Sequence, residues 1–254
     1  MALLGTFTGS RSLTLTAIFA AMIAVLDSIP MVPGFYGGIW DSWGFMLSPL
    51  VGILLGPVLG IISVGIGGLV GHLVYFRDPI ELFFMLGAPI GAGVAGLIFE
   101  ERWNVACAIY SAMIVGYFVT PVTWSLSLLG VWDVLASFVL ILAITILTTL
   151  NKAGNGILSS TNLKMILATV IGLESDILAR IFILIPGQMY WLYYAMPLEV
   201  LQGLWLVAGV VTPIKVVLAS IATIAIGKSL LEIFPQQTAE LNDTNFEKEE
   251  KERH

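Results

Sequence analysis

Charged residues are scarce in this chain of 254 residues, where Asp, Glu, Lys and Arg make up 11% and hydrophobic residues 58%. A soluble domain carries about a quarter charged residues. So little charge excludes an ordinary soluble domain. It predicts an all-α, multi-pass protein of the cell membrane, built as one helical bundle.

Cysteine and histidine are almost absent. Cys107 is the single cysteine, and His72 and His254 are the two histidines. One cysteine excludes an intrachain disulfide and a cysteine-based metal site. With so few histidines, the sequence predicts no metal site and no cofactor, and it argues against a nickel or cobalt carrier.

Two motifs are also missing. No G-x-x-x-x-G-K-[ST] occurs, so the chain has no nucleotide-binding loop of its own. No basic cluster occurs either, which excludes nucleic acid as a partner. Much of the net charge of −6 comes from residues 235–254, which are predicted to form a disordered acidic cytoplasmic tail after one transmembrane domain, residues 1–234.

Long apolar runs dominate what remains, and about 20 apolar residues suffice to cross a membrane. The candidate spans are Leu13–Ile29, Phe45–Leu55, Pro57–Phe76, Leu82–Phe99, Val105–Thr123, Val134–Leu150, Leu163–Ile185 and Leu198–Leu230. The second run is too short to cross alone, and a Gly56-Pro57 break separates it from the third. The last run is too long, so it must tilt, kink near Thr212-Pro213 or emerge into the cytoplasm.

The basic residues orient these spans. With a cytoplasmic N-terminus, five fall on or near the cytoplasmic side and Arg77 alone falls outside. The five are Arg11, Arg102, Lys152, Lys164 and Lys228. This split predicts eight helices with both termini in the cytoplasm. If Phe45–Phe76 formed one tilted span, there would be seven, and that alternative remains open.

Aromatic residues gather in two of the loops on the predicted outer side, Pro30–Trp43 and Pro186–Pro197. An interfacial belt explains such residues singly, but their concentration on one side favours a substrate pocket. The aromatic residues predicted to line it are Tyr36, Trp40, Trp43, Tyr190 and Trp191. The loop Pro30–Trp43 is predicted to close over the pocket as a lid.

The run IGLESDILARIFILIP, within Leu163–Ile185, carries three ionisable residues, Glu174, Asp176 and Arg180. Inserting three central charges into the membrane costs about 9 kcal/mol, whereas the apolar side chains of this helix favour insertion by about 6 kcal/mol. The helix therefore needs protein neighbours, water or a ligand. Asp176 and Arg180 have the i,i+4 spacing, acid first, of a helical ion pair, which is predicted to be structural.

Glu174 lies about 200° around the helix from Asp176 and near the membrane midplane. It requires a partner on another helix, a ligand or a proton of its own. We predict that it faces the substrate pocket near Glu199 and Gln202, which share one face of the last helix. Asp27 is predicted to join them, although capping explains Asp27 and the helix dipole explains Glu199 equally well.

The segments LTAIFAAMIAVLDSIP and LSPLVGILLGPVLGIISVGIGGLVGHLV, with the ending PGQMYWLYY…VVTPIKVVLASI, resemble the S component of an energy-coupling-factor (ECF) transporter. The resemblance covers about three-quarters of the chain. It implies a small membrane subunit that captures a vitamin or similar micronutrient. The usual six helices differ from the eight counted here, because Val105–Leu150 forms an additional hairpin.

The resemblance also implies partner subunits. Alanines of the first helix in this family contact the membrane-embedded T subunit, and the matching small-xxx-small pairs here are Ala17/Ala21 and Ala20/Ala24. Small residues let a second helix approach closely in lipid, although packing within the chain is an equal explanation. Separate ATPase subunits would supply the energy, so the chain itself is not expected to be an enzyme.

Two other functions remain open. One is a membrane-embedded enzyme acting on a lipid or isoprenoid phosphate, for which the sequence offers only Glu100 and Glu101 beside Arg102. The other is a stand-alone secondary transporter. For the capture subunit, aromatic walls with acids suit a heterocyclic vitamin or a cationic ring such as thiamine. Lys215 is predicted to snorkel toward the cytoplasm.

Overall fold

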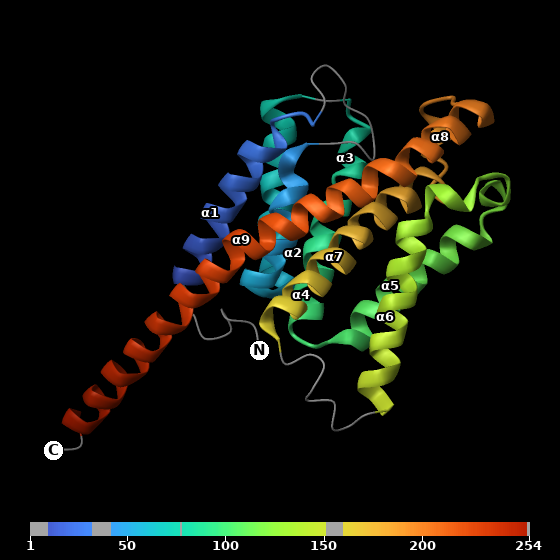
Figure 1. The fold of residues 1–254 in the computed structure, drawn as a ribbon. Helices are drawn as coiled ribbons and strands as arrows, with labels where there is room; N and C mark the ends of the chain where they lie inside the picture. Colours follow the sequence, from blue (N-terminus) through green and yellow to red (C-terminus); the bar gives the residue numbers. More distant parts are fainter. Residues whose placement is uncertain (1–9, 32–41, 77, 151–159, 253–254) are drawn as a thin grey trace.

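The chain folds as a bundle of α-helices (Figure 1). The computed structural model describes residues 10–31, 42–76, 78–150 and 160–252, with side chains as far as residue 230. The α-helices of this part are α1 (Ser10–Asp27), α2 (Ser48–Val74), α3 (Glu81–Phe84), α4 (Gly87–Phe99), α5 (Trp103–Val119), α6 (Trp132–Leu150), α7 (Thr161–Leu184), α8 (Met189–Leu192) and α9 (Leu198–Glu252). Three 3₁₀ turns join them: η1 (Trp43–Met46), η2 (Pro121–Ser125) and η3 (Leu128–Gly130).

Five of the described helical segments are long and apolar enough to cross a membrane. They are α1, α2, Glu81–Phe99, α6 and the part of α9 from Leu198 to Leu230. The 24 residues of α7 are also sufficient in length, but its three central charges lower its hydropathy. The chain is therefore a multi-pass membrane protein.

A sharp break at Gly56 divides α2. Gly56 has φ 78° and ψ 174°, a conformation open to glycine and closed to residues with a Cβ. A Cβ on Gly60 would lie 2.8 Å from the Cα of Gly52, eight residues earlier, whereas eight residues of straight helix span about 12 Å. The arm 48–55 thus folds back against the arm 57–74, which confirms the break predicted at Gly56-Pro57.

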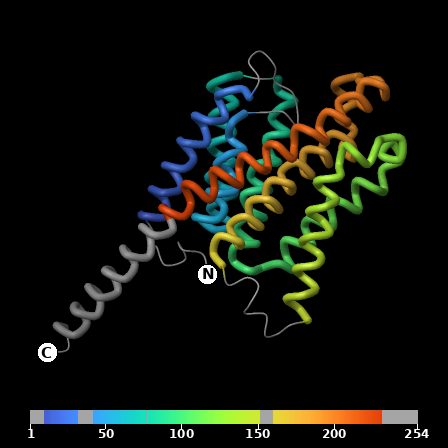
Figure 2. The backbone as a smooth tube through the Cα atoms, viewed as in Figure 1, coloured from blue at the N-terminus to red at the C-terminus, as the bar shows by residue number. Residues whose placement is uncertain are grey.

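The helix α7 runs through the middle of the bundle and contacts α2, α4, α5, α6 and α9. In Figures 1 and 2, α1 and α2 lie on one flank and α5 and α6 on the other. The first residue of α1 and the far end of α9 lie at the same end of the bundle. We call this the Ser10 end, and the opposite one, where α1 finishes, the Asp27 end.

One boundary differs from the predictions. The helix α5 ends at Val119, whereas the predicted span continued to Thr123. It ends there because Pro121 cannot donate the next helical hydrogen bond, and η2 begins at that residue. The disordered acidic tail expected for residues 235–254 stays a prediction.

Small residues bring α4 and α7 into backbone contact. A Cβ on Gly91 of α4 would lie 2.7 Å from the carbonyl oxygen of Gly172 and 2.8 Å from the Cβ of Asp176. A Cβ on Gly172 would meet the carbonyl oxygen of Gly91 at 2.9 Å. These distances are shorter than van der Waals contact, so α7 can occupy its central position only because these residues lack side chains.

We expect Gly91→Ala to destabilise the bundle by about 1–3 kcal/mol, the usual cost of overpacking a core. Gly203→Ala is the matched control, because no atom lies within 4 Å of a Cβ built at Gly203. Both substitutions gain similar helix propensity, so their difference isolates the steric cost. Thermal unfolding in detergent measures it, and equal melting temperatures for the two variants would contradict the close α4–α7 contact.

Candidate functional site

The three ionisable residues of α7 are enclosed by protein. Glu174 and Asp176 are each 2% exposed and Arg180 is 3% exposed, within a stretch of α7 that is buried without interruption from residue 171 to residue 181. The predicted need for neighbours is met by the surrounding helices, and the charged groups do not face lipid.

Asp176 and Arg180 form an ion pair, as their spacing predicts. The Nε of Arg180 donates to Oδ1 of Asp176 at 2.6 Å. Arg180 lies four residues before α7 finishes at Leu184. Arg180 also lines a cavity.

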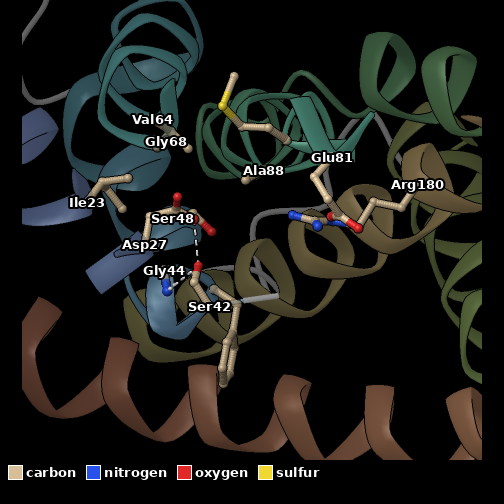
Figure 3. Close-up of a pocket in the computed structure, with 12 residues that line it drawn as sticks. Ile23, Asp27, Ser42, Gly44, Ser48, Val64, Gly68, Glu81, Ala88 and Arg180 are labelled. Carbon is tan, nitrogen blue, oxygen red and sulfur yellow. Dashed lines mark hydrogen bonds between the residues drawn. The ribbon is translucent and has the colours of Figure 1, made fainter. Parts of the chain in front are cut away.

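This cavity lies at the Asp27 end, between α1, η1, α2, α3, α4 and α7 (Figure 3). Its polar lining consists of Asp27, Ser42, Ser48, Glu81 and Arg180, and apolar residues such as Phe45 complete it. Ser42 Oγ donates to Asp27 Oδ1 at 2.6 Å, while Glu81 and Arg180 extend toward the same space from the other side. The free interior is about 20 Å³, enough for one or two water molecules.

Tyr194, between α8 and α9, reaches over to α3 beside the cavity. Its hydroxyl donates to Glu81 Oε1 at 3.4 Å, and its ring centroid lies 6.4 Å from that of Phe84. Burial, together with the negative charges of Glu81 and Asp78, raises the pKa of Tyr194. The hydroxyl therefore keeps its hydrogen and remains a donor at neutral pH.

Glu174 is not among the residues that line this cavity, and its predicted place in an outer pocket stays a prediction. It interacts electrostatically with Asp133 of α6 and Lys215 of α9. Lys215 follows Gln202 by 13 residues, or about 20 Å along α9. Glu174 thus lies too deep to meet Glu199 or Gln202, which belong to the first turns of α9.

Lys215 is 1% exposed, and its Nζ lies 5.0 Å from the centroid of the Phe45 ring. The prediction that it snorkels out of the bundle is therefore wrong. Snorkelling is a property of lysines that face lipid near a helix end, whereas this lysine faces the interior. Lys215 brings a cation to the depth at which Glu174 lies.

The other predicted polar residues of α9 are engaged elsewhere. Gln202 Nε2 donates to the carbonyl oxygen of Ser125 in η2 at 2.9 Å, and Glu199 is exposed. Neither residue contributes to the cavity. Asp27 is the predicted acid that does line it, with its side chain buried and bonded to Ser42.

The aromatic predictions have mixed outcomes. Trp43 stacks on the cavity residue Phe45, with 5.9 Å between ring centroids. Tyr190 is half-buried against the main hydrophobic core, and Trp191 is 60% exposed. From the loop Pro186–Pro197 it is therefore Tyr194, not Trp191, that approaches the cavity. Tyr36 and Trp40 lie outside the described residues, as does most of the predicted lid.

The two alanine pairs of α1 face different ways. Ala17 and Ala21 are exposed. The other pair turns toward α2, where a Cβ on Gly67 would lie 2.5 Å from Ala20 O and one on Gly71 would lie 2.8 Å from Ala24 O. Ala20 and Ala24 therefore serve packing within the chain, and the pair open to a neighbouring helix is Ala17/Ala21.

Several residues of these sites were missed by the sequence analysis. Glu81, Ser42 and Ser48 border the cavity but sit in loops or at helix starts, where polar residues are ordinary. Asp133 stands in the first turn of α6, where the helix dipole favours an acid. The available signal was position, because Asp133 directly precedes the apolar run Val134–Leu150.

Comparison of the chain with protein-family models, with curated proteins and with solved structures finds no match. The resemblance to ECF S components therefore rests on the sequence motifs alone.

We expect Asp176→Asn to destabilise the protein by about 3 kcal/mol, because it removes the carboxylate that neutralises a buried guanidinium. Glu174→Gln, six residues from Arg180 on the same helix, is the matched control. It should retain the fold, because it leaves the ion pair between Asp176 and Arg180 intact. Thermal unfolding of the two purified variants tests this. A stable Asp176→Asn beside an unstable Glu174→Gln would exchange the two roles.

Proposed function

We propose that this protein is the S component of an ECF transporter, which captures a micronutrient outside the cell for ATP-driven uptake. The observation that carries this proposal is the cavity at the Asp27 end. Asp27, Glu81 and Arg180 are buried together there, although burial in a membrane protein penalises every ionisable group. Such groups usually mark the path of a solute or ion.

The charge of the cavity favours a solute with a cationic or amine-bearing group. Asp27 and Glu81 contribute two carboxylates, while the guanidinium of Arg180 is already paired with Asp176. Two serine hydroxyls add hydrogen-bonding capacity, and the Phe45 ring supplies an aromatic face on which a cation can rest. A cationic heterocyclic vitamin has this chemistry.

A vitamin needs far more space than one or two water molecules, so binding must separate elements that line the cavity. The elements best suited to move are η1 and α3, which contain four residues each. Short segments with few internal hydrogen bonds open at lower free energy than long helices. Movement of α3 would also break the contact between Glu81 and Tyr194.

The basic residues support an orientation with the Asp27 end outside. The helices α1 and α7 begin at the Ser10 end (Figure 1), and Arg11 and Lys164 lie in their first turns. Lys164 forms an ion pair there with Glu101, next to Arg102 in the sequence. Cytoplasmic sides carry an excess of such residues. In this arrangement eight helical segments alternate in direction, counting the two arms of α2, and both termini are cytoplasmic.

The partner subunits would dock on α1. Ala17 and Ala21 form an exposed small-xxx-small pair on α1, whose opposite face is fixed by α2. Purification of the tagged protein from its native membrane tests the proposal. We expect a T subunit and ATPase subunits to copurify, and recovery of the chain alone under conditions that preserve membrane complexes would contradict it.

We expect the double variant Ala17→Leu/Ala21→Leu to lose copurification of the ATPase subunits while its folded yield is unchanged. Ala108→Leu/Ala112→Leu on α5 is the matched control, since these alanines are also exposed and four residues apart. The bulkier side chains prevent close helix approach only where a partner docks. If both variants keep the complex, or both lose it, α1 is not the docking surface.

A stand-alone secondary transporter is the second candidate. The observation in its favour is the broken helix α2, because discontinuous helices form the binding sites of many such transporters. The copurification experiment separates the two, since a secondary transporter requires no ATPase. The acids proposed for an enzyme, Glu100 and Glu101, are instead directed to separate basic partners, Arg102 and Lys164.

A further inference from the structure

A second group of ionisable residues lies deeper in the bundle, away from the cavity. Glu174 of α7, Asp133 of α6 and Lys215 of α9 are 2%, 6% and 1% exposed. Glu174 interacts electrostatically with both of the others. It lies six residues, or about 9 Å, deeper along α7 than Arg180. We call these three residues the inner cluster.

The inner cluster has more acids than bases. It contains two carboxyl groups and one amine, so full ionisation would leave one uncompensated negative charge in the bundle interior. An isolated charge at such a place costs several kcal/mol. Tyr110 of α5 also interacts with Glu174 and is not a cation, and α4 carries no titratable side chain. One added positive charge would balance the cluster.

The hydrogen bonds around Asp133 indicate which carboxyl group stays ionised. Asp133 Oδ1 accepts from the N–H of Val134 at 2.9 Å, and Oδ2 accepts from the hydroxyl of Thr212 on α9. Hydrogen bonds donated to a carboxylate favour its ionised form. Asp133 is therefore the better supported carboxylate of the two.

Glu174 is the second carboxyl group of the inner cluster. Its Oε2 is buried and has no hydrogen-bond partner, although a buried carboxylate oxygen ordinarily accepts at least one bond. The charge of Asp133 acts on Glu174, and two interacting carboxyl groups can share one proton as a pair. A metal ion would need several oxygen ligands and would be repelled by the nearby Lys215, whereas a proton needs only one oxygen.

We propose that Asp133 and Glu174 form a proton-binding pair that holds a single proton, with Lys215 balancing the remaining negative charge. The proton rests on Glu174, whose buried Oε2 has no hydrogen-bond partner, and Asp133 is the second carboxyl group that can accept it. The site joins α6, α7 and α9, so a change in its occupancy alters the contact of all three helices. This proposal does not depend on the transport function proposed above.

The proposal predicts the number of protonated carboxyl groups in each variant. The native cluster holds one. Asp133→Asn and Glu174→Gln each hold none, because the remaining carboxylate balances Lys215. Lys215→Met holds two, because no cation remains to stabilise either carboxylate. Glu199→Gln is the control, since Glu199 is exposed and should not change the number.

Infrared difference spectroscopy of the purified protein at neutral pH counts these groups through the carbonyl stretch of the un-ionised carboxyl. We expect the same one-proton loss in both acid variants and a one-proton gain in Lys215→Met. A native band unchanged in both acid variants would overturn the proposal. So would loss in only one of them, which would assign the proton to a single residue. If an acid variant does not fold, the Lys215→Met arm decides, and an unchanged count there overturns the shared pair.

Discussion

Hydrocarbon cannot solvate an ionised side chain, and this constraint determines where α7 lies. The helix carries Glu174, Asp176 and Arg180 within seven residues, so each exposure to lipid would cost several kcal/mol. Enclosing α7 in protein removes that cost only if neighbouring helices come close. The glycines of α4 permit the closest approach, with a Gly91 Cβ position only 2.7 Å from the backbone of Gly172. The other helices then complete the enclosure.

Once α7 is central, its polar residues fall at two depths with different surroundings. Near the Asp27 end, Arg180 is held by Asp176 and borders a cavity with Asp27 and Glu81. Deeper in the bundle, Glu174 lies within electrostatic range of Asp133 of α6 and Lys215 of α9. The first site is suited to a solute because it has several donors and acceptors around a cavity. The second is suited to a proton because it is buried and short of one positive charge.

Hydropathy and charge spacing predicted the membrane bundle, the break at Gly56-Pro57 and the Asp176–Arg180 pair, because each depends on residues close together in the sequence. The partners of Glu174 could not be predicted in this way. Helical geometry says that Glu174 points away from Asp176, but it does not say which of the other helices lies there. Lys215 was misplaced for the same reason: a lysine in an apolar run is compatible with lipid and with the interior, and only the packing of α9 distinguishes them.

Small-molecule mass spectrometry of the purified protein tests most directly the claim that the cavity at the Asp27 end captures a solute. We predict that the native protein retains a compound with a cationic or amine group, and that Asp27→Asn retains about 10- to 100-fold less, the effect of losing one charge-assisted hydrogen bond. Asparagine can still accept the bond from Ser42, so the fold should survive. Glu199→Gln, which alters an exposed acid, should retain the compound fully. Equal retention by native protein and Asp27→Asn would contradict the account.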